Sequence, residues 1–277
     1  MSASVGSGSS NNASRRHGIG LAQAFRTMTI LPAFGCDAES VASQLYFFPL
    51  VGIVVGLLGA ALVLLLLVCI SAGGTLGSVQ SLVCGVLWTV WMAYATRAFH
   101  LDGLADTFDG FGGGWTVERR LEIMKDSRIG SFGVVAIVSC LALKASLAAL
   151  AVYDGFLYGL VWSCAVARCM VVFACCFSKY AKPQGLSYEL VSQARPRHFV
   201  ASVVWVVALA FAFPSLYGLG LRSALRTAVS FALAFAAALY LLHVSKRKIG
   251  GVTGDVLGAC CELCEVASLA GFVFARF

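Results

Sequence analysis

Long apolar segments separated by short polar connections dominate the chain. Between Glu39 and Arg97 no Asp, Glu, Lys, Arg or His interrupts the sequence, whereas about 20 apolar residues already span a bilayer when they form a helix. Seven segments are long enough to cross a membrane, at residues 45–70, 79–100, 132–152, 156–177, 199–216, 224–244 and 256–275. The last is the least regular, because Glu262 and Glu265 fall inside it. The pattern predicts an all-α, polytopic membrane bundle of about seven transmembrane helices.

The composition favours a membrane protein over a water-soluble one. Of the 277 residues, 60% are hydrophobic and 12% are charged, whereas soluble domains carry about 25% charged residues. Most of the eleven cysteines lie in apolar segments, where we expect small buried residues and not a disulfide framework. Residues 1–18 are rich in Ser, Gly and Asn and are expected to form a disordered polar tail. Residues 19–277 would then form a single membrane-embedded domain.

The distribution of Lys and Arg predicts the orientation of the helices. The formal net charge of +7 comes from short clusters and not from a continuous basic face, so nucleic acid is not an expected partner. The clusters precede the first apolar segment and follow the second, fourth and sixth, whereas the other connections carry only Arg222, with Arg226 just inside the next segment. Cytoplasmic connections are enriched in Lys and Arg. Seven helices with a cytoplasmic N-terminus satisfy this alternation, which predicts a multi-pass protein of the cytoplasmic (inner) membrane.

Three aspartates follow the second apolar segment at helical spacing. Asp102, Asp106 and Asp109 stand at positions i, i+4 and i+7, which places them on one face if the stretch is a helix. Like charges at short range repel one another unless a cation neutralises them, and carboxylate oxygens suit Mg²⁺ or Mn²⁺ held together with substrate phosphates. We therefore interpret the three aspartates as metal ligands. The alternative is an acidic helix end that is merely solvated.

A basic stretch further along the same connection suits phosphate binding. Lys125 and Arg128 are separated by Asp126 and Ser127 and are followed by Gly130. Cationic side chains, a hydroxyl and free backbone N–H groups near glycine can hold phosphate oxygens. Combined with a metal site, this stretch indicates a substrate that contains a pyrophosphate group. The basic residues could equally do no more than mark a cytoplasmic connection.

Two further acids and two isolated cations lie within or at the edge of apolar segments. Asp255 and Glu262 are seven residues apart and share a helical face, and carboxylates inside a membrane are functional candidates because they are costly there. They could hold a second metal or a substrate hydroxyl. Lys144 and Arg168 are the isolated cations of the third and fourth segments and need these acids or a bound phosphate as partners. His100, near the start of the aspartate series, could be a general base, a metal ligand or an interfacial residue.

Four stretches of the sequence carry a family resemblance. They are HLDGLADTFDGFGGGW at 100–115, RRLEIMKDSRIGSFG at 119–133, GGVTGDVLGACCELCE at 250–265 and FFPLVG at 47–52. Together they resemble the cobalamin synthase family, the adenosylcobinamide-GDP ribazoletransferases, over about residues 25–270. The cysteines of the third motif depart from the family pattern, in which small residues are expected. The resemblance implies an integral membrane enzyme that joins adenosylcobinamide-GDP to α-ribazole or its 5′-phosphate and releases GMP, with Mg²⁺ required.

The resemblance also implies roles for the residues above, with residues 19–277 as the catalytic domain. The expected metal ligands are Asp102, Asp106, Asp109, Asp255 and Glu262, the last two of which could instead orient ribazole. The expected phosphate-binding residues are Lys125, Ser127, Arg128, Lys144 and Arg168. Asp109 or His100 would take the proton of the attacking hydroxyl. The lipid bilayer is a further partner, and other cobalamin-pathway enzymes or a second copy of the chain are left open.

Two other classes of protein remain as alternatives. The acidic spacing is also similar to that of CDP-alcohol phosphotransferases, but Ala105 is followed by Asp106 where that family has Arg, and the downstream acids do not keep its spacing. A secondary transporter would use intramembrane acids for coupling ions. The sequence shows no internal inverted repeat, and the acids gather at one side of the predicted membrane, which favours chemistry at the surface.

Overall fold

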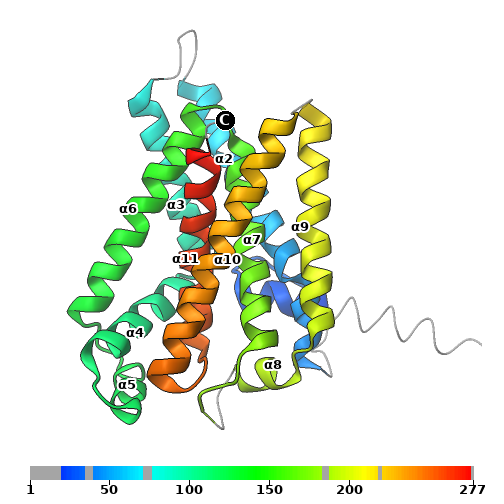
Figure 1. Cartoon of the computed structure of the whole chain (residues 1–277). Helices are drawn as coiled ribbons and strands as arrows, with labels where there is room; N and C mark the ends of the chain where they lie inside the picture. The colour runs from blue at the N-terminus through cyan, green and yellow to red at the C-terminus, as the bar shows by residue number, and fades with distance from the viewer. Residues whose placement is uncertain (1–19, 35–39, 71–76, 183–186, 218–219, 276–277) are drawn as a thin grey trace, which may run out of the picture.

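The computed structural model describes residues 20–34, 40–70, 77–182, 187–217 and 220–275, so the predicted tail at 1–18 lies outside the described residues. Apart from one isolated backbone bridge, every element among the described residues is a helix (Figure 1). A helix at residues 20–28 precedes η1 (Val41–Phe47), α2 (Phe48–Ile70), α3 (Ser78–Ala95), α4 (Phe99–Gly113), α5 (Val117–Ile123), α6 (Ser131–Tyr153), α7 (Leu157–Phe177), α8 (Tyr188–Gln193), α9 (Pro196–Tyr217), α10 (Leu221–Ile249) and α11 (Gly254–Phe274).

Each of the seven predicted apolar segments is a helix, which confirms the polytopic bundle. Within the described ranges, six helices are long and apolar enough to cross a membrane, and a shorter apolar stretch, Pro196–Ala212, lies in α9. Helix α11 forms through Glu262 and Glu265 without interruption. The second segment ends earlier than predicted, at Ala95, because Arg97 and Ala98 take left-handed φ angles of 54° and 53°. A left-handed conformation cannot continue an α-helix, so α4 starts as a separate element.

The bundle has two central helices surrounded by the others. In α7 89% of the apolar span is buried and in α11 78%, against 28–39% for the spans of α2, α3, α6 and α10. The outer helices expose large apolar side chains, including Leu65, Val68 and Tyr240, as expected of surfaces that face lipid. The bundle core therefore lies along α7 and α11.

Glycines allow the helices to approach closely. A Cβ atom on Gly52 of α2 would lie 2.5 Å from the carbonyl oxygen of Cys164 in α7, and one on Gly271 of α11 would lie 2.7 Å from Cα of Ser230 in α10. Lipid offers no hydrophobic drive for helix association, so membrane bundles rely on small residues and close packing of this kind. The cysteines of α7 and α11 are mostly buried and unbridged, as the sequence predicted.

The polar connections gather at one end of the bundle. Helices α4, α5 and α8 and the turn between α10 and α11 lie at that end, and the C-terminus lies at the other (Figure 1). The end that carries α4 is the end where the sequence places its Lys-rich and Arg-rich connections, and it holds the candidate site.

Candidate active site

Helix α4 carries His100 and the three predicted aspartates, and it is helical over all of them. The side chain of Asp102 is exposed, that of Asp106 is half-buried and that of Asp109 is buried. The left-handed residues Arg97 and Ala98 immediately precede the helix and set its direction relative to α3. Such backbone is costly for residues other than glycine and gathers at functional sites.

Close packing of α4 against α11 brings Asp255 to the aspartate series. A Cβ atom on Gly103 would lie 2.7 Å from the carbonyl oxygen of Asp255, and one on Gly258 would lie 3.2 Å from that of His100. The Thr253 hydroxyl accepts the N–H of Val256 at 3.3 Å and so caps α11. Asp255 is thus held on the first turn of α11, beside α4.

Asp102, Asp106 and Asp255 form a group of like charges, which we call the acidic cluster. Burial raises the pKa of Asp106 to about 7, with further contributions from the charges of Asp102, Asp255 and Asp109. Asp255 accepts a hydrogen bond from the Thr253 hydroxyl at 3.2 Å. No cation among the described residues forms an ion pair with any member of the cluster. No basic side chain of the described residues therefore neutralises the cluster by direct contact.

Asp109, unlike the members of this cluster, has its carboxylate bound by two backbone N–H groups. Its Oδ2 accepts the N–H of Gly130 at 2.7 Å and its Oδ1 accepts the N–H of Gly133 at 2.8 Å, at the start of α6. A Cβ atom on Gly130 would lie 2.5 Å from the carboxylate, so glycine is required for this contact. We expected these N–H groups to be free for phosphate, but Asp109 occupies them. The motifs at 100–115 and 119–133 are thus joined through the carboxylate of Asp109.

Two basic side chains fix the last turn of α4. Arg120 of α5 donates to the carbonyl oxygens of Gly114 at 2.9 Å and of Lys248 at 2.8 Å, and Lys248 donates to the carbonyl oxygen of Phe111 at 2.6 Å. Cations at a helix C-terminus interact favourably with its carbonyl groups. Arg120 and Lys248 belong to the basic clusters that predicted the orientation of the helices, and in the structure they also hold α4 in place.

The predicted phosphate-binding stretch between α5 and α6 lies on the surface. Lys125, Ser127 and Arg128 are exposed. Arg128 is bound to Asp126, donating through Nε to Oδ1 at 3.1 Å and through a terminal nitrogen to Oδ2 at 2.7 Å. This pair holds the pKa of Asp126 at about 2.

Lys182 is a cation near the acidic cluster that the sequence analysis did not select. A backbone bridge joins Tyr180 to Val252 and ties the α7–α8 connection to the α10–α11 turn. Burial lowers the pKa of Lys182, while the charge of Asp255 raises it and that of Lys125 lowers it. Lys182, Lys125 and Asp255 are therefore electrostatic neighbours. The contact joins segments about 70 residues apart, so no local pattern signals it.

Glu262 is not part of the acidic cluster. It lies two turns deeper in α11 and pairs with Lys144 of α6 at 2.6 Å, while Glu265 binds both Lys144 and Arg168 of α7, the latter at 2.8 Å. These four side chains, which we call the ion cluster, are 1–5% exposed and balance two positive with two negative charges. Of the two kinds of partner that the sequence left open for Lys144 and Arg168, the structure supplies the acids.

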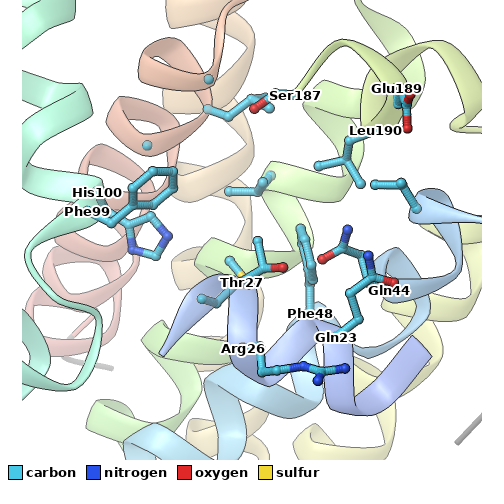
Figure 2. Close-up of a pocket in the computed structure, with 16 residues that line it drawn as sticks. Gln23, Arg26, Thr27, Gln44, Phe48, Phe99, His100, Ser187, Glu189 and Leu190 are labelled. Atoms are coloured by element: carbon cyan, nitrogen blue, oxygen red, sulfur yellow. The ribbon is translucent and has the colours of Figure 1, made fainter. Parts of the chain in front are cut away.

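His100 lines a cavity beside the acidic cluster (Figure 2). The side chain is 3% exposed, and its Nδ1 has no hydrogen-bond partner among the described residues. Burial lowers the pKa of His100 to about 3, with the positive charge of Arg168 acting in the same direction. The imidazole is therefore neutral near pH 7.

The arrangement defines a class of protein. It is a helical membrane bundle with a carboxylate site at the end of the bundle that carries the polar connections. A family model described as cobalamin-5-phosphate synthase matches residues 20–273. The chain therefore belongs to the cobalamin-5-phosphate synthase family, whose members are enzymes of cobalamin synthesis.

Curated relatives agree with the family. A protein of Chlorobium phaeobacteroides (strain BS1) named adenosylcobinamide-GDP ribazoletransferase is 37% identical over 256 residues, which cover 92% of this chain and 97% of the relative. A protein with the same name from Chlorobaculum tepidum is 37% identical over 90% of this chain and 92% of its own length. Another, from Syntrophobacter fumaroxidans, is 36% identical over 91% of this chain and 96% of its own length. No solved structure matches the chain significantly.

Proposed function

We propose that this enzyme transfers the adenosylcobinamide phosphate of adenosylcobinamide-GDP to α-ribazole or its 5′-phosphate and releases GMP. The observation that carries the proposal is the acidic cluster of Asp102, Asp106 and Asp255, which has no cationic partner among the described residues. The names of the relatives support the donor and the acceptor. A hydroxyl oxygen of the acceptor bonds to the phosphorus attached to cobinamide, the bond from that phosphorus to the bridging oxygen breaks, and GMP leaves with that oxygen.

The donor atoms of the acidic cluster fit Mg²⁺, and they also suit Mn²⁺. Carboxylate oxygens are the ligands of both cations. In the described part of the chain, no three His, Cys, Asp or Glu side chains converge closely enough to hold a metal by themselves. Mg²⁺ sites commonly use one or two carboxylates together with substrate phosphates and water, so Asp102, Asp106 and Asp255 would hold it jointly with the substrate. When bound, the metal supplies positive charge to the diphosphate and to the leaving GMP.

The remaining residues divide into those that face the substrate and those that hold the site. Lys182 and Lys125 bind the phosphates of the donor, a role supported by the electrostatic interactions of Lys182 with both Asp255 and Lys125. Of the two residues expected to take the hydroxyl proton, Asp109 is occupied by two N–H groups, whereas His100 has an Nδ1 with no partner among the described residues. His100 therefore accepts the hydrogen of the attacking hydroxyl. Asp109 positions α4 against α6, and we leave Glu262, Lys144 and Arg168 out of the substrate site.

The test is turnover by the purified protein in nanodiscs with adenosylcobinamide-GDP, α-ribazole 5′-phosphate and Mg²⁺, with GMP and the corrinoid product both measured. We expect equal amounts of the two products and no turnover in EDTA. Consumption of a CDP-alcohol in place of adenosylcobinamide-GDP would instead favour the phospholipid-type reaction.

We also propose that the acidic cluster faces the cytoplasm, because the connections at its end of the bundle carry most of the Lys and Arg residues. Sealed inside-out vesicles of the inner membrane should release GMP from externally added adenosylcobinamide-GDP, and sealed right-side-out vesicles should not. Uptake of an intact substrate without release of GMP would favour a transporter.

A further inference from the structure

A cavity of about 570 Å³ lies next to the acidic cluster. It is lined by residues of the helix at residues 20–28, η1, the start of α2, the start of α4, α7, α8 and the start of α11. Two of its lining residues, His100 and Gly254, lie within two residues of Asp102 and Asp255 in the sequence. A volume of this size suits a small organic molecule, and its place suits one that reacts at the acidic cluster.

The wall of the cavity contains buried polar atoms that lack partners among the described residues. They are the side-chain carbonyl oxygens of Gln23 and Gln44 and Nδ1 of His100. Gln44 is 2% exposed and His100 is 3% exposed. A buried polar atom without a hydrogen bond is unfavourable, and most such atoms in folded proteins are paired. A ligand that donates hydrogen bonds to the two amide oxygens would satisfy them.

These polar atoms stand on opposite sides of the cavity. Figure 2 shows Gln23 and Gln44 on one side, next to Phe48, and His100 with Phe99 on the other. Most of the remaining lining is apolar, including Leu190. The cavity therefore fits a molecule with an apolar, flat portion and a small number of hydroxyl or N–H donors.

We propose that this cavity, which we call the amide cavity, binds the acceptor substrate, an aromatic base carried on a ribose. The base packs against Phe48 and Phe99, ribose hydroxyls donate to the amide oxygens of Gln23 and Gln44, and the attacking hydroxyl lies at His100, beside the acidic cluster. The inference rests on the proposed function, because it takes the acceptor from that reaction.

The guanosine half of the donor offers related chemistry, since it too is a base on a ribose. Guanine carries several polar atoms around its edge that need both donors and acceptors, whereas the buried unpartnered atoms of the cavity wall are two amide oxygens and one imidazole nitrogen. The other polar residues of the lining are Arg26, Thr27, Ser187 and Glu189. An apolar aromatic base leaves fewer polar atoms unsatisfied in this lining. The acceptor is therefore the better fit, and GMP serves as the competing probe.

The test is calorimetric binding of α-ribazole 5′-phosphate to the purified full-length protein, which requires no turnover. Gln44→Leu should raise the Kd about tenfold, as loss of a hydrogen bond to a buried group predicts. Gln23→Leu, in a different helix, should do the same and covers the case in which the first variant does not fold. Gln80→Leu is the matched control, because Gln80 lies in the first turn of α3, outside the cavity lining. Its Kd should equal that of the parent.

The same titrations with GMP show whether the cavity binds the acceptor or the guanosine half of the donor. Weaker GMP binding in both variants, with acceptor binding unchanged, would overturn the proposal and assign the cavity to the donor. Absence of acceptor binding by the folded parent would overturn it as well. If the parent binds the acceptor through Gln23 and Gln44 but releases no GMP from adenosylcobinamide-GDP, the proposed reaction fails while the cavity assignment stands.

Discussion

Helix α11 carries acidic side chains at two depths, and their surroundings differ. Asp255 on its first turn lies with Asp102 and Asp106, and no described cation pairs with any of them. Glu262 and Glu265, about 10 Å and about 15 Å deeper at 1.5 Å per residue, are each bound to a cation of a neighbouring helix. Carboxylates are thus paired with cations within the bundle and have no ion-pair partner among the described residues at its end.

This difference separates a structural from a functional use of charge. A buried ion pair is weak evidence for net stability, but its geometry fixes which helices meet, and the ion cluster joins α6, α7 and α11. Unpaired like charges held together by the fold are relieved by a bound cation or by a proton. We therefore expect substitutions in the ion cluster to affect folding and those in the acidic cluster to affect turnover.

The largest expected effect is on stability, in the ion cluster. Lys144→Met removes the cation that two buried glutamates share, and loss of one partner of a buried ion pair costs about 3–5 kcal/mol. Thermal unfolding of the purified variant in detergent should show a marked fall in Tm. An unchanged Tm would contradict the assignment of this cluster to structure.

The next largest effect is on turnover, in the acidic cluster. Asp106→Asn should lower kcat/KM by about 100-fold or more, because a catalytic metal contributes several kcal/mol to the transition state and 1.36 kcal/mol corresponds to a factor of ten. Its Tm should equal or exceed that of the parent, since one of the like charges is gone. Asp126→Asn, which alters an exposed acid at the same end of the bundle, is the control and should keep parental turnover.

Asp109 provides an intermediate case, because it lies on the same helix as the acidic cluster but has partners. Asp109→Asn replaces one accepting oxygen by an NH₂ group that faces a backbone N–H, which costs about 1–3 kcal/mol. Tm and turnover should therefore fall together, unlike in Asp106→Asn. Loss of turnover with a parental Tm would return Asp109 to the metal ligands.

The smallest effect is on pH dependence. Burial and its acidic neighbours raise the pKa of Asp106 to about 7 in the metal-free protein, so below pH 7 a proton competes with the cation for this carboxylate. The Mg²⁺ concentration for half-maximal GMP release should rise about fivefold from pH 7 to pH 6 and change little above pH 8. Equal Mg²⁺ requirements at pH 6 and pH 8 would show that Asp106 does not bind the cation.

Hydrophobic pattern was sufficient to predict the bundle, because every crossing helix must be apolar over its length. The helical spacing of Asp102 and Asp106 was also readable, as was the need of Lys144 and Arg168 for partners. The distinction between Asp109 and its neighbours was not, since it depends on N–H groups 21 and 24 residues away. Spacing along one helix identifies a shared face but not the groups that the face meets.

Residues that long-range contacts bring to the site gave no sequence signal. Lys182 reaches Asp255 through the bridge between Tyr180 and Val252, and in the sequence it is one Lys in a basic connection. Gln23 and Gln44 are isolated amides in mainly apolar segments, and only the packing of separate helices shows that both line one cavity.

The most direct test of the account is metal binding at the acidic cluster. Electron paramagnetic resonance of Mn²⁺ can be followed as purified protein is added in the presence of adenosylcobinamide-GDP, with the parent, Asp106→Asn and Asp126→Asn compared. The account predicts that the parent and Asp126→Asn deplete free Mn²⁺ equally and that Asp106→Asn binds it at least about tenfold more weakly. Equal binding by folded Asp106→Asn and parent would contradict the claim that the unpaired carboxylates form the metal site.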